Sequence, residues 1–373
     1  MGLSLMEGNE AIAWGAVEAG CRYFAGYPIT PATTIFNTML QLLPPLGGIV
    51  IQGEDEIASM GSCLGASMTG LKAMAATAGP GLSLYSEHIS FAVGSEIPIV
   101  IVVVQRLGPS TGSATRGADG DIQFMRWGSS GGLPVVVLAP VDVKDCFSLT
   151  INAFNLAETY RVPVFIASNK EIAMTRESVD LDAIQRPEIV NRTAPSPGKP
   201  FLPFGVPEGG SVPHFLAIGD RILVRQTSST HGADGYITTD YNEIGGNQER
   251  LKAKLESAVD RFSFHEAFMA QEADTLLVTY GVTARAAKEV RKVLAADGIP
   301  ISLLILKTLW PVPEALIRDK AEKVKRVVVV EMNTGQYVGE VKRVLGDKKV
   351  DFFGQMDGRL ISPNQIREVI RHG

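Results

Sequence analysis

Short apolar runs that alternate with helical stretches are the feature that most constrains this fold. In the first half of the chain the expected strands are Arg22–Ala25, Gly48–Gln52, Lys72–Thr77, Pro98–Gln105, Pro134–Leu138 and Pro163–Ala167. The helices expected between them are Glu10–Ala19, Pro31–Leu42, Glu54–Met68 and Val143–Tyr160. Because strands buried on both faces are almost continuously apolar, this alternation is typical of a parallel sheet with helices on either side. We therefore predict that residues 1–185 form a doubly wound α/β domain.

A second alternating unit begins near Asp274 and predicts a smaller α/β domain at residues 263–373. Its expected strands are Thr275–Thr279, Ile301–Leu306 and Arg326–Glu331. Its expected helices are Thr283–Ala296, Pro313–Lys323 and Gln336–Leu345, with a last short helix that starts at Ser362 and Pro363. Serine followed by proline is a typical helix start.

Residues 186–262 are predicted to connect the two domains. Six prolines fall between Pro195 and Pro213, and proline disfavours both helix interiors and central strands. Beyond them, Arg221–Gln226 and Gly235–Thr239 form a possible hairpin, and Asn247–Phe262 is charged like a surface helix.

Composition narrows the possible functions. The chain has 35 basic and 40 acidic residues and a net charge of -5, which argues against nucleic acid as a partner, since phosphate binding needs a concentrated basic face. Its longest apolar run, Ile97–Val104, is too short to cross a bilayer, and no basic segment precedes an apolar one near the start. We therefore expect a cytoplasmic protein that binds neither nucleic acid nor membrane.

Cysteine and histidine spacing gives no sign of a metal centre. Cys21, Cys63 and Cys146 form no CxxC pair, and the five histidines show no HExxH spacing. A disulfide framework, a zinc site or an iron–sulfur cluster carried by this chain alone is therefore disfavoured. We predict no metal site on the chain.

The segment Tyr27-Pro28-Ile29-Thr30-Pro31 is the first of three at the carboxyl end of an expected strand, where ligands bind in open α/β sheets. Each proline holds the preceding residue in an extended conformation. A structural explanation is that Thr30 caps the next helix with Pro31 at its first position. A functional explanation is a carboxylate bound at that helix start.

The second segment opens with Glu54, Asp55 and Glu56 at the start of an expected helix. Acidic residues are favourable at that position, which explains Glu54 and Asp55 without any function. It does not explain Gly61 and Gly65, which disfavour the middle of a helix. A close interface or a bound ligand accounts for them more simply.

The third segment, Thr77-Ala78-Gly79-Pro80-Gly81, is predicted to be a turn directly after a strand. Glycines on both sides of the proline indicate a backbone that another group approaches closely.

Taken in order, these segments resemble the pyrimidine-binding domain of thiamine-diphosphate enzymes, in which a glutamate opens a helix and a TSGPG-like turn follows the next strand. Tyr27–Pro31 resembles the YPITP motif of the 2-oxoacid:ferredoxin oxidoreductases. Gln105–Gly112 resembles the QRxGPSTG segment of their 2-oxoglutarate-type alpha subunits, and Glu331–Gln336 resembles a segment of the same family. The resemblance implies that the last domain is similar to the C-terminal domain of transketolase.

The resemblance also implies roles for individual residues. Glu56 would be the catalytic carboxyl that hydrogen-bonds the aminopyrimidine ring of the cofactor, with Glu54 as the rival assignment. Thr30 and Arg106 would bind the 2-oxoacid substrate. Cofactor contacts are implied for Tyr27, Pro28, Ile29, Glu56, Gly79 and Gly81.

The implied reaction is oxidative decarboxylation of a 2-oxoacid, with 2-oxoglutarate favoured, to its acyl-CoA with electrons passing to ferredoxin. The resemblance implies a beta subunit that shares the thiamine diphosphate and carries Mg²⁺ and a [4Fe–4S] cluster, with coenzyme A as co-substrate. It implies an (alpha-beta)2 assembly in which this chain is inactive alone.

Several alternatives stay open from the sequence. Pyruvate, branched-chain 2-oxoacids, another thiamine system and a noncatalytic assembly subunit all fit, and Arg116 is a candidate for a second substrate carboxylate. Asp119-Gly120-Asp121 looks like the GDG signature that anchors magnesium and diphosphate, but no buried strand precedes it. We interpret it as a polar loop near the substrate entrance.

Overall fold

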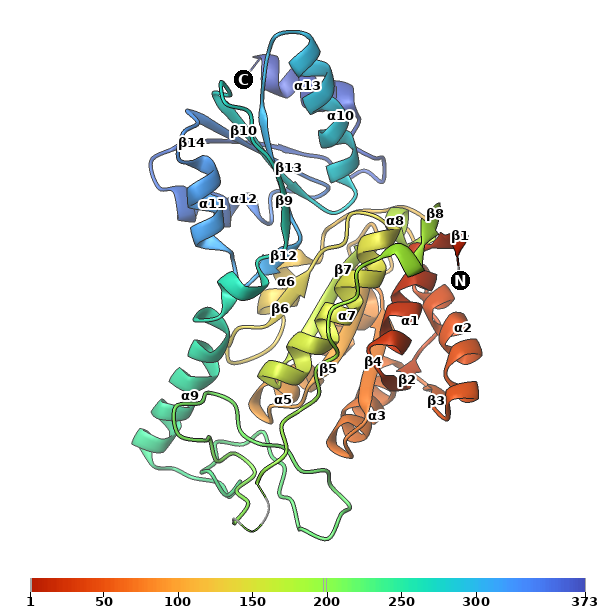
Figure 1. Cartoon of the computed structure of the whole chain (residues 1–373), viewed down its shortest axis with the longest axis vertical. Helices are drawn as coiled ribbons and strands as arrows, with labels where there is room; N and C mark the ends of the chain where they lie inside the picture. Colours follow the sequence, from red (N-terminus) through yellow and green to blue (C-terminus); the bar gives the residue numbers. More distant parts are fainter. Residues whose placement is uncertain (1, 197, 199, 373) are drawn as a thin grey trace.

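The computed structural model describes residues 2–196, 198 and 200–372, so Pro197 and Lys199 of the proline-rich stretch lie outside it. Within these residues the larger sheet has the strand order β12-β6-β7-β5-β4-β2-β3. Its strands are β2 (Cys21–Gly26), β3 (Ile49–Gln52), β4 (Lys72–Thr77), β5 (Ile99–Gln105), β6 (Val136–Leu138), β7 (Pro163–Asn169) and β12 (Thr308–Trp310). All neighbours are parallel except β12 and β6 (Figure 1).

Helices cover both faces of the larger sheet. On one face lie α1 (Gly8–Glu18), α2 (Thr33–Leu42) and α7 (Val143–Tyr160), and on the other lie α3 (Glu56–Met68), α4 (Gly79–Leu84) and α5 (Ser86–Gly94). Every residue of β5 between them is buried, as the apolar sequence of this strand requires. The predicted doubly wound α/β domain is confirmed.

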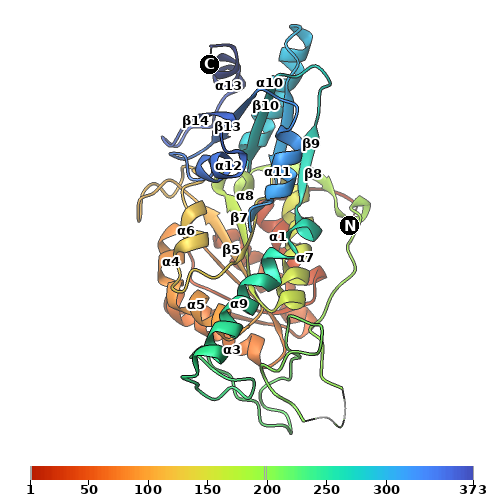
Figure 2. The same ribbon diagram turned by 90° about the vertical axis from the view of Figure 1, so that its left-hand side faces the viewer.

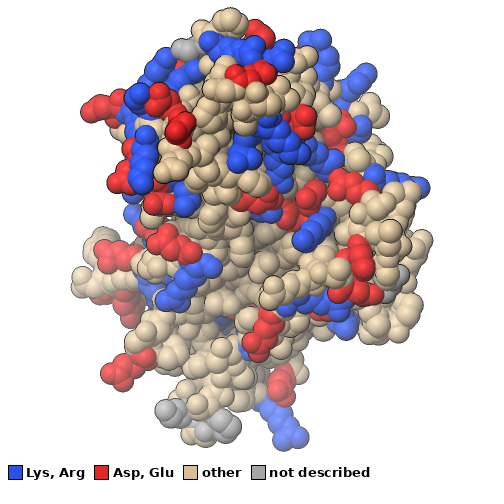
Figure 3. Space-filling view, turned by 45° about the horizontal axis from the view of Figure 1, so that its top comes forward, with Lys and Arg blue, Asp and Glu red and all other residues tan. Residues whose placement is uncertain are grey.

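The smaller sheet has the order β14-β13-β10-β11-β9. Its strands are β9 (His265–Phe268), β10 (Thr275–Tyr280), β11 (Ser302–Leu306), β13 (Arg326–Glu331) and β14 (Lys349–Gly354). The helices α10 (Thr283–Ala296) and α13 (Pro363–His372) pack together, as do α11 (Glu314–Ala321) and α12 (Val338–Leu345). On the face shown in Figure 3, basic and acidic side chains intermingle. The smaller domain has ion pairs such as Arg343–Glu314, 2.7 Å apart.

The sequence patterns missed the short and polar elements. β1 (Leu3–Glu7) pairs antiparallel with β8 (Arg176–Asp180), and α6 (Ile122–Trp127) and α8 (Lys170–Met174) follow β5 and β7. β12 belongs to the second half of the chain but pairs with β6 of the larger sheet, with Thr308 opposite Leu138. The domain boundaries themselves remain a prediction.

The connector differs from its expected structure. The strands expected at Arg221–Gln226 and Gly235–Thr239 do not form among the described residues, which have only a single bridge there, His231 to Ile237. Its helix, α9 (Tyr241–Glu256), starts earlier than expected because the Asp240 carboxylate accepts hydrogen bonds from the first N–H groups. It also ends earlier, and a separate 3-10 turn follows at Val259–Phe262.

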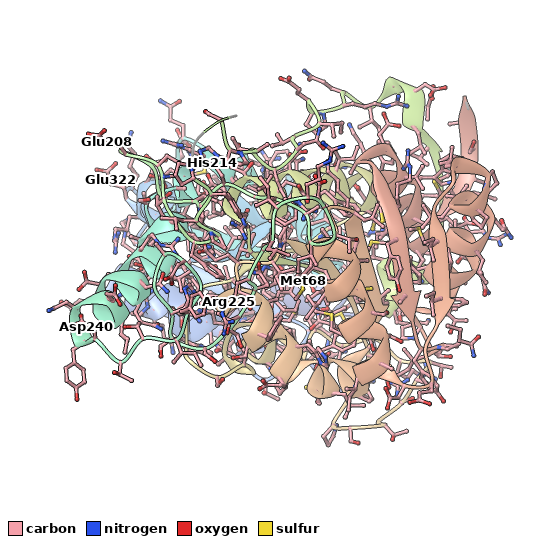
Figure 4. The ribbon with its side chains drawn as sticks, turned by 90° about the horizontal axis from the view of Figure 1, so that it is seen from below. Met68, Glu208, His214, Arg225, Asp240 and Glu322 are labelled. Carbon is pink, nitrogen blue, oxygen red and sulfur yellow. The ribbon has the colours of Figure 1, made fainter. Side chains whose placement is uncertain are left out.

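The connector covers the amino-terminal ends of the larger sheet's central strands. The Ile218 N–H donates to the Met68 carbonyl at the end of α3, 2.9 Å away, and Figure 4 shows this side of the molecule. The smaller domain stands at the opposite end, beyond the carboxyl ends of the strands (Figure 2). No described helix is long and apolar enough to span a membrane.

Candidate functional site

Four segments gather at the carboxyl edge of the larger sheet, on the side of the smaller domain. Thr30 follows β2, Glu56 follows β3, Gly79 follows β4 and Arg106 follows β5. Because β2, β3, β4 and β5 run parallel, these residues meet at one edge of the sheet.

Glu56 is the first residue of α3 and is only 7% exposed. The helix begins there because the Asp55 carboxylate accepts a hydrogen bond of 2.7 Å from the Ala58 N–H. Glu54, the rival candidate, is exposed. The three successive acids therefore differ: Glu54 is exposed, Asp55 caps the helix and Glu56 is buried.

Gly81 packs against Glu56. A Cβ atom added at Gly81 would lie 2.6 Å from Glu56 Cγ and 2.7 Å from Glu56 Oε1, and it would overlap Thr77 Oγ1. A side chain at this position would have to displace the buried carboxyl. The predicted turn at Thr77–Gly81 is wrong in one respect, because α4 begins at Gly79, with Pro80 in its first turn.

The two glycines inside α3 have different surroundings. A Cβ at Gly61 would lie 3.1 Å from His88 Nε2, so close packing explains this glycine. Gly65 is exposed and faces open space.

Arg106 is 7% exposed and its Nη1 donates to the Thr30 carbonyl oxygen at 2.5 Å. Its Nε is buried without a hydrogen-bond partner in the part of the chain that the structure describes. Thr30 does not cap α2, which begins at Thr33 after Ala32, so the structural explanation of this segment is wrong. Tyr27 is exposed, and Pro28 and Ile29 are half-buried beside it.

The Asp119–Asp121 loop is not the polar entrance loop that we expected. Asp119 is 2% exposed: its Oδ1 accepts from Asn169 Nδ2 at 2.8 Å, and its carbonyl oxygen accepts from Asn333 Nδ2 at 2.9 Å. Burial raises the pKa of Asp119 to about 7. Asp119 is instead buried between the two domains, and Gly120 and Asp121 are half-buried.

Asp121 extends this loop to the site. Its N–H donates to Gln105 Oε1 at 2.9 Å, and a Cβ at Gly79 would lie 3.1 Å from its Oδ2. Burial raises the pKa of Asp121 to about 6, although the charge of Arg106 lowers it. The sequence analysis placed Asp121 only in a polar loop and gave it no role of its own; its position shortly after the Arg106 strand was the available signal.

Arg116 is exposed, and its stem lies against Gly358 of the smaller domain. No group of three or more His, Cys, Asp or Glu among the described residues could hold a metal ion.

Known families cover both domains. The family described as pyruvate flavodoxin/ferredoxin oxidoreductase, thiamine diphosphate-binding, matches residues 14–249. The family described as pyruvate:ferredoxin oxidoreductase core domain II matches residues 273–366.

Individual relatives match over nearly the whole chain. The 2-oxoglutarate synthase subunit KorA of Methanothermobacter thermautotrophicus is 40% identical and covers 98% of this chain and 97% of its own length. The ketoisovalerate oxidoreductase subunit VorB of Methanothermobacter marburgensis is 31% identical over 100% and 97% of the two chains.

A solved structure is also similar to nearly the whole chain. The 2-oxoglutarate:ferredoxin oxidoreductase of Magnetococcus marinus, with 2-oxoglutarate, coenzyme A and succinyl-CoA bound, is similar with a TM-score of 0.93 and 32% identity. The match covers 99% of this chain and 65% of that one.

Proposed function

The chain belongs to the thiamine-diphosphate-binding family of pyruvate flavodoxin/ferredoxin oxidoreductases, and from that premise we propose that it is the alpha subunit of a 2-oxoglutarate:ferredoxin oxidoreductase. The enzyme would convert 2-oxoglutarate and coenzyme A to succinyl-CoA and CO₂, with electrons passing to ferredoxin. The observation that carries the proposal is the buried Glu56 packed on Gly81 at the same sheet edge as the Arg106–Thr30 pair.

The residues present fit a thiamine ring. Gly81 and Gly79 have no side chains, so the Glu56 and Asp121 carboxyls lie directly against their backbone, and Glu56 is held at the sheet edge where the ring would bind. Glu56 would hold a proton against a ring nitrogen, and Tyr27, Pro28 and Ile29 would line the ring. Bound thiamine diphosphate would supply the nucleophilic carbon and the electron sink.

Arg106 and Thr30 would orient the substrate. The guanidinium of Arg106 is fixed by the Thr30 carbonyl and keeps its Nε free, so it can bind a carboxylate. We favour 2-oxoglutarate over branched-chain acids because the chain is 40% identical to a 2-oxoglutarate synthase subunit and 31% identical to a ketoisovalerate enzyme subunit. Arg116 stays the proposed contact for the distal carboxylate.

The active enzyme would need a second chain. We propose that a beta subunit binds the diphosphate, Mg²⁺ and the [4Fe–4S] cluster, that two such pairs associate, and that ferredoxin accepts the electrons. The exposed Tyr27 and the open face at Gly65 leave surface for that partner. The three cysteines are buried free thiols, as in cytoplasmic proteins, and we propose that location.

Co-purification of this chain with the adjacent gene product, followed by a viologen-reduction assay with coenzyme A and a series of 2-oxoacids, tests the proposal. We expect dye reduction with 2-oxoglutarate at a higher kcat/KM than with pyruvate or 2-oxoisovalerate, and none from this chain alone. Absence of dye reduction with every 2-oxoacid would contradict the proposed enzymatic function.

Glu56→Gln should lower kcat by a factor of about 10² to 10⁴, because glutamine cannot hold the proton at the ring. The complex should still assemble, as measured by gel filtration. The matched control is Glu54→Gln, which removes the exposed neighbouring carboxylate and should leave kcat unchanged. Full activity of Glu56→Gln would mean that another residue holds the proton at the ring.

A further inference from the structure

Arg106 Nε and Asp121 Oδ2 are buried at the site and have no hydrogen-bond partner among the described residues; Asp119 Oδ2, in the same loop but enclosed by the smaller domain, is a third such atom. Buried polar atoms are almost always paired, so each unpaired one indicates a missing partner. The Arg106 side chain is more than nine-tenths buried and fixed at its other end by Thr30. The pair therefore points to a polar ligand that contacts both residues.

Asp121 is held in place from two sides. The Gln105 side chain, adjacent to Arg106, accepts from its N–H at 2.9 Å. On the other side, the smaller domain binds the same loop, because the Asp119 N–H donates to the Met332 carbonyl at 2.8 Å and the Gln123 N–H donates to Gln336 Oε1 at 3.0 Å. These bonds fix the backbone that carries Asp121, while its carboxyl oxygen Oδ2 keeps no partner and is available to a substrate.

We propose that Asp121 is a substrate-binding residue and that its protonated carboxyl donates a hydrogen bond to the 2-oxoacid carboxylate held by Arg106. This inference rests on the proposed function, because it names a further contact of the same substrate. It assigns Asp121 a role different from that of an ordinary acid, which would form an ion pair with Arg106.

The charges around Asp121 are consistent with a proton on it when an anion binds. An ionised Asp121 would repel the substrate carboxylate, whereas its protonated form offers a donor. Burial raises the pKa of Asp121 to about 6, although the positive charge of Arg106 lowers it. Asp119 is the nearest acid in the same loop, and Glu331 acts on it from β13. The segments Gly79–Leu84 and Met332–Gln336, which pack against the loop, contain no titratable side chain.

The test compares three forms of the alpha–beta complex. For the wild type, KM for 2-oxoglutarate should rise about tenfold between about pH 5 and about pH 8, as Asp121 loses its proton and one hydrogen bond. Asp121→Asn keeps a donor that does not titrate, so its KM should stay low across this range. Asp121→Leu has no donor, so its KM should be about tenfold higher throughout.

Calorimetry provides a second readout that does not depend on turnover. Titration of 2-oxoglutarate into the complex without thiamine diphosphate, in buffers of different ionisation enthalpy, should show proton uptake on binding in the wild type near about pH 6.5 and none in Asp121→Asn. The exposed Asp347→Asn is the control and should match the wild type. Thermal melting verifies that each variant is folded.

Each outcome decides between the alternatives. If Asp121 only orients Arg106 through an ion pair, Asp121→Asn should raise KM at every pH, and this result would overturn the inference. So would equal proton uptake in wild type and variant, or no binding at all. Wild-type complex that binds 2-oxoglutarate with proton uptake but reduces no dye would contradict the proposed function and leave this inference standing.

Discussion

At the residue scale, the site depends on the absence of a side chain at Gly81. The backbone of Gly81 contacts both Glu56 and Thr77, so the position of the buried carboxyl is set by a neighbour that has no Cβ. The sequence predicted this close approach from the glycines around Pro80, although it could not identify which group approaches.

We expect Gly81→Ala to lower kcat about a hundredfold, because the added methyl displaces the Glu56 carboxyl from its position. Overpacking should also lower the free energy of unfolding by about 1–3 kcal/mol. Steady-state kinetics and urea unfolding measure the two effects. The control is Gly245→Ala in α9, where a Cβ meets nothing within 4 Å. That variant should keep full activity.

At the element scale, α9 is attached to the larger domain through a buried ion network. Glu96, which is fully buried, accepts from Lys254 Nζ at 2.8 Å and from Arg250 Nη2 at 2.6 Å. Burial alone would raise the pKa of Glu96, but Lys254, Arg250 and Arg161 lower it to about 2. This contact explains why a helix that looked like a free surface helix has a buried lysine.

Glu96→Gln should lower the free energy of unfolding by about 3 kcal/mol at neutral pH, because it leaves buried cations unpaired. Since the folded pKa lies below the unfolded value, the contribution of Glu96 is complete above about pH 4.5 and is lost as the pH falls toward 2. The difference between wild type and variant should shrink over that window in urea unfolding. Glu256→Gln, in the exposed pair with Lys252, should change stability by less than about 0.5 kcal/mol.

The elements that were predicted correctly are those with a strong hydrophobic period. The strands around β5 and the helix Val143–Tyr160 are long and apolar, so local pattern defines them. β12 and β14 were missed because they are short or half-exposed and depend on partners distant in sequence. For the same reason the sequence analysis assigned Asp121 no role of its own. Gln105, which accepts from its N–H, and Gln336, which accepts from the N–H of Gln123 in the same loop, are brought to the loop only by the folded chain.

At the scale of the whole molecule, the Asp119–Gln123 loop joins the two domains. Asp119 receives hydrogen bonds from Asn169 at the end of β7 and from Asn333 after β13. A Cβ at Gly281 would lie 3.3 Å from its Oδ2, so the smaller domain also encloses the carboxyl itself. The substrate contact that we infer for Asp121 would therefore depend on docking of the smaller domain.

Asp119 should make this junction sensitive to pH. Burial, with Glu331 and Asp121, raises its pKa from 3.8 to about 7, so the folded chain retains a proton that the unfolded chain releases. The contribution of this proton to stability is complete below pH 3.8 and is lost as the pH rises to about 7. Asp119→Asn keeps an oxygen acceptor for Asn169 and removes the titration. Its stability relative to wild type should improve by about 2 kcal/mol between about pH 5 and about pH 7.5 in urea unfolding. A difference that stays constant across this range would mean that Asp119 is ionised in the folded protein and that the junction is held by charge instead of by a buried neutral carboxyl.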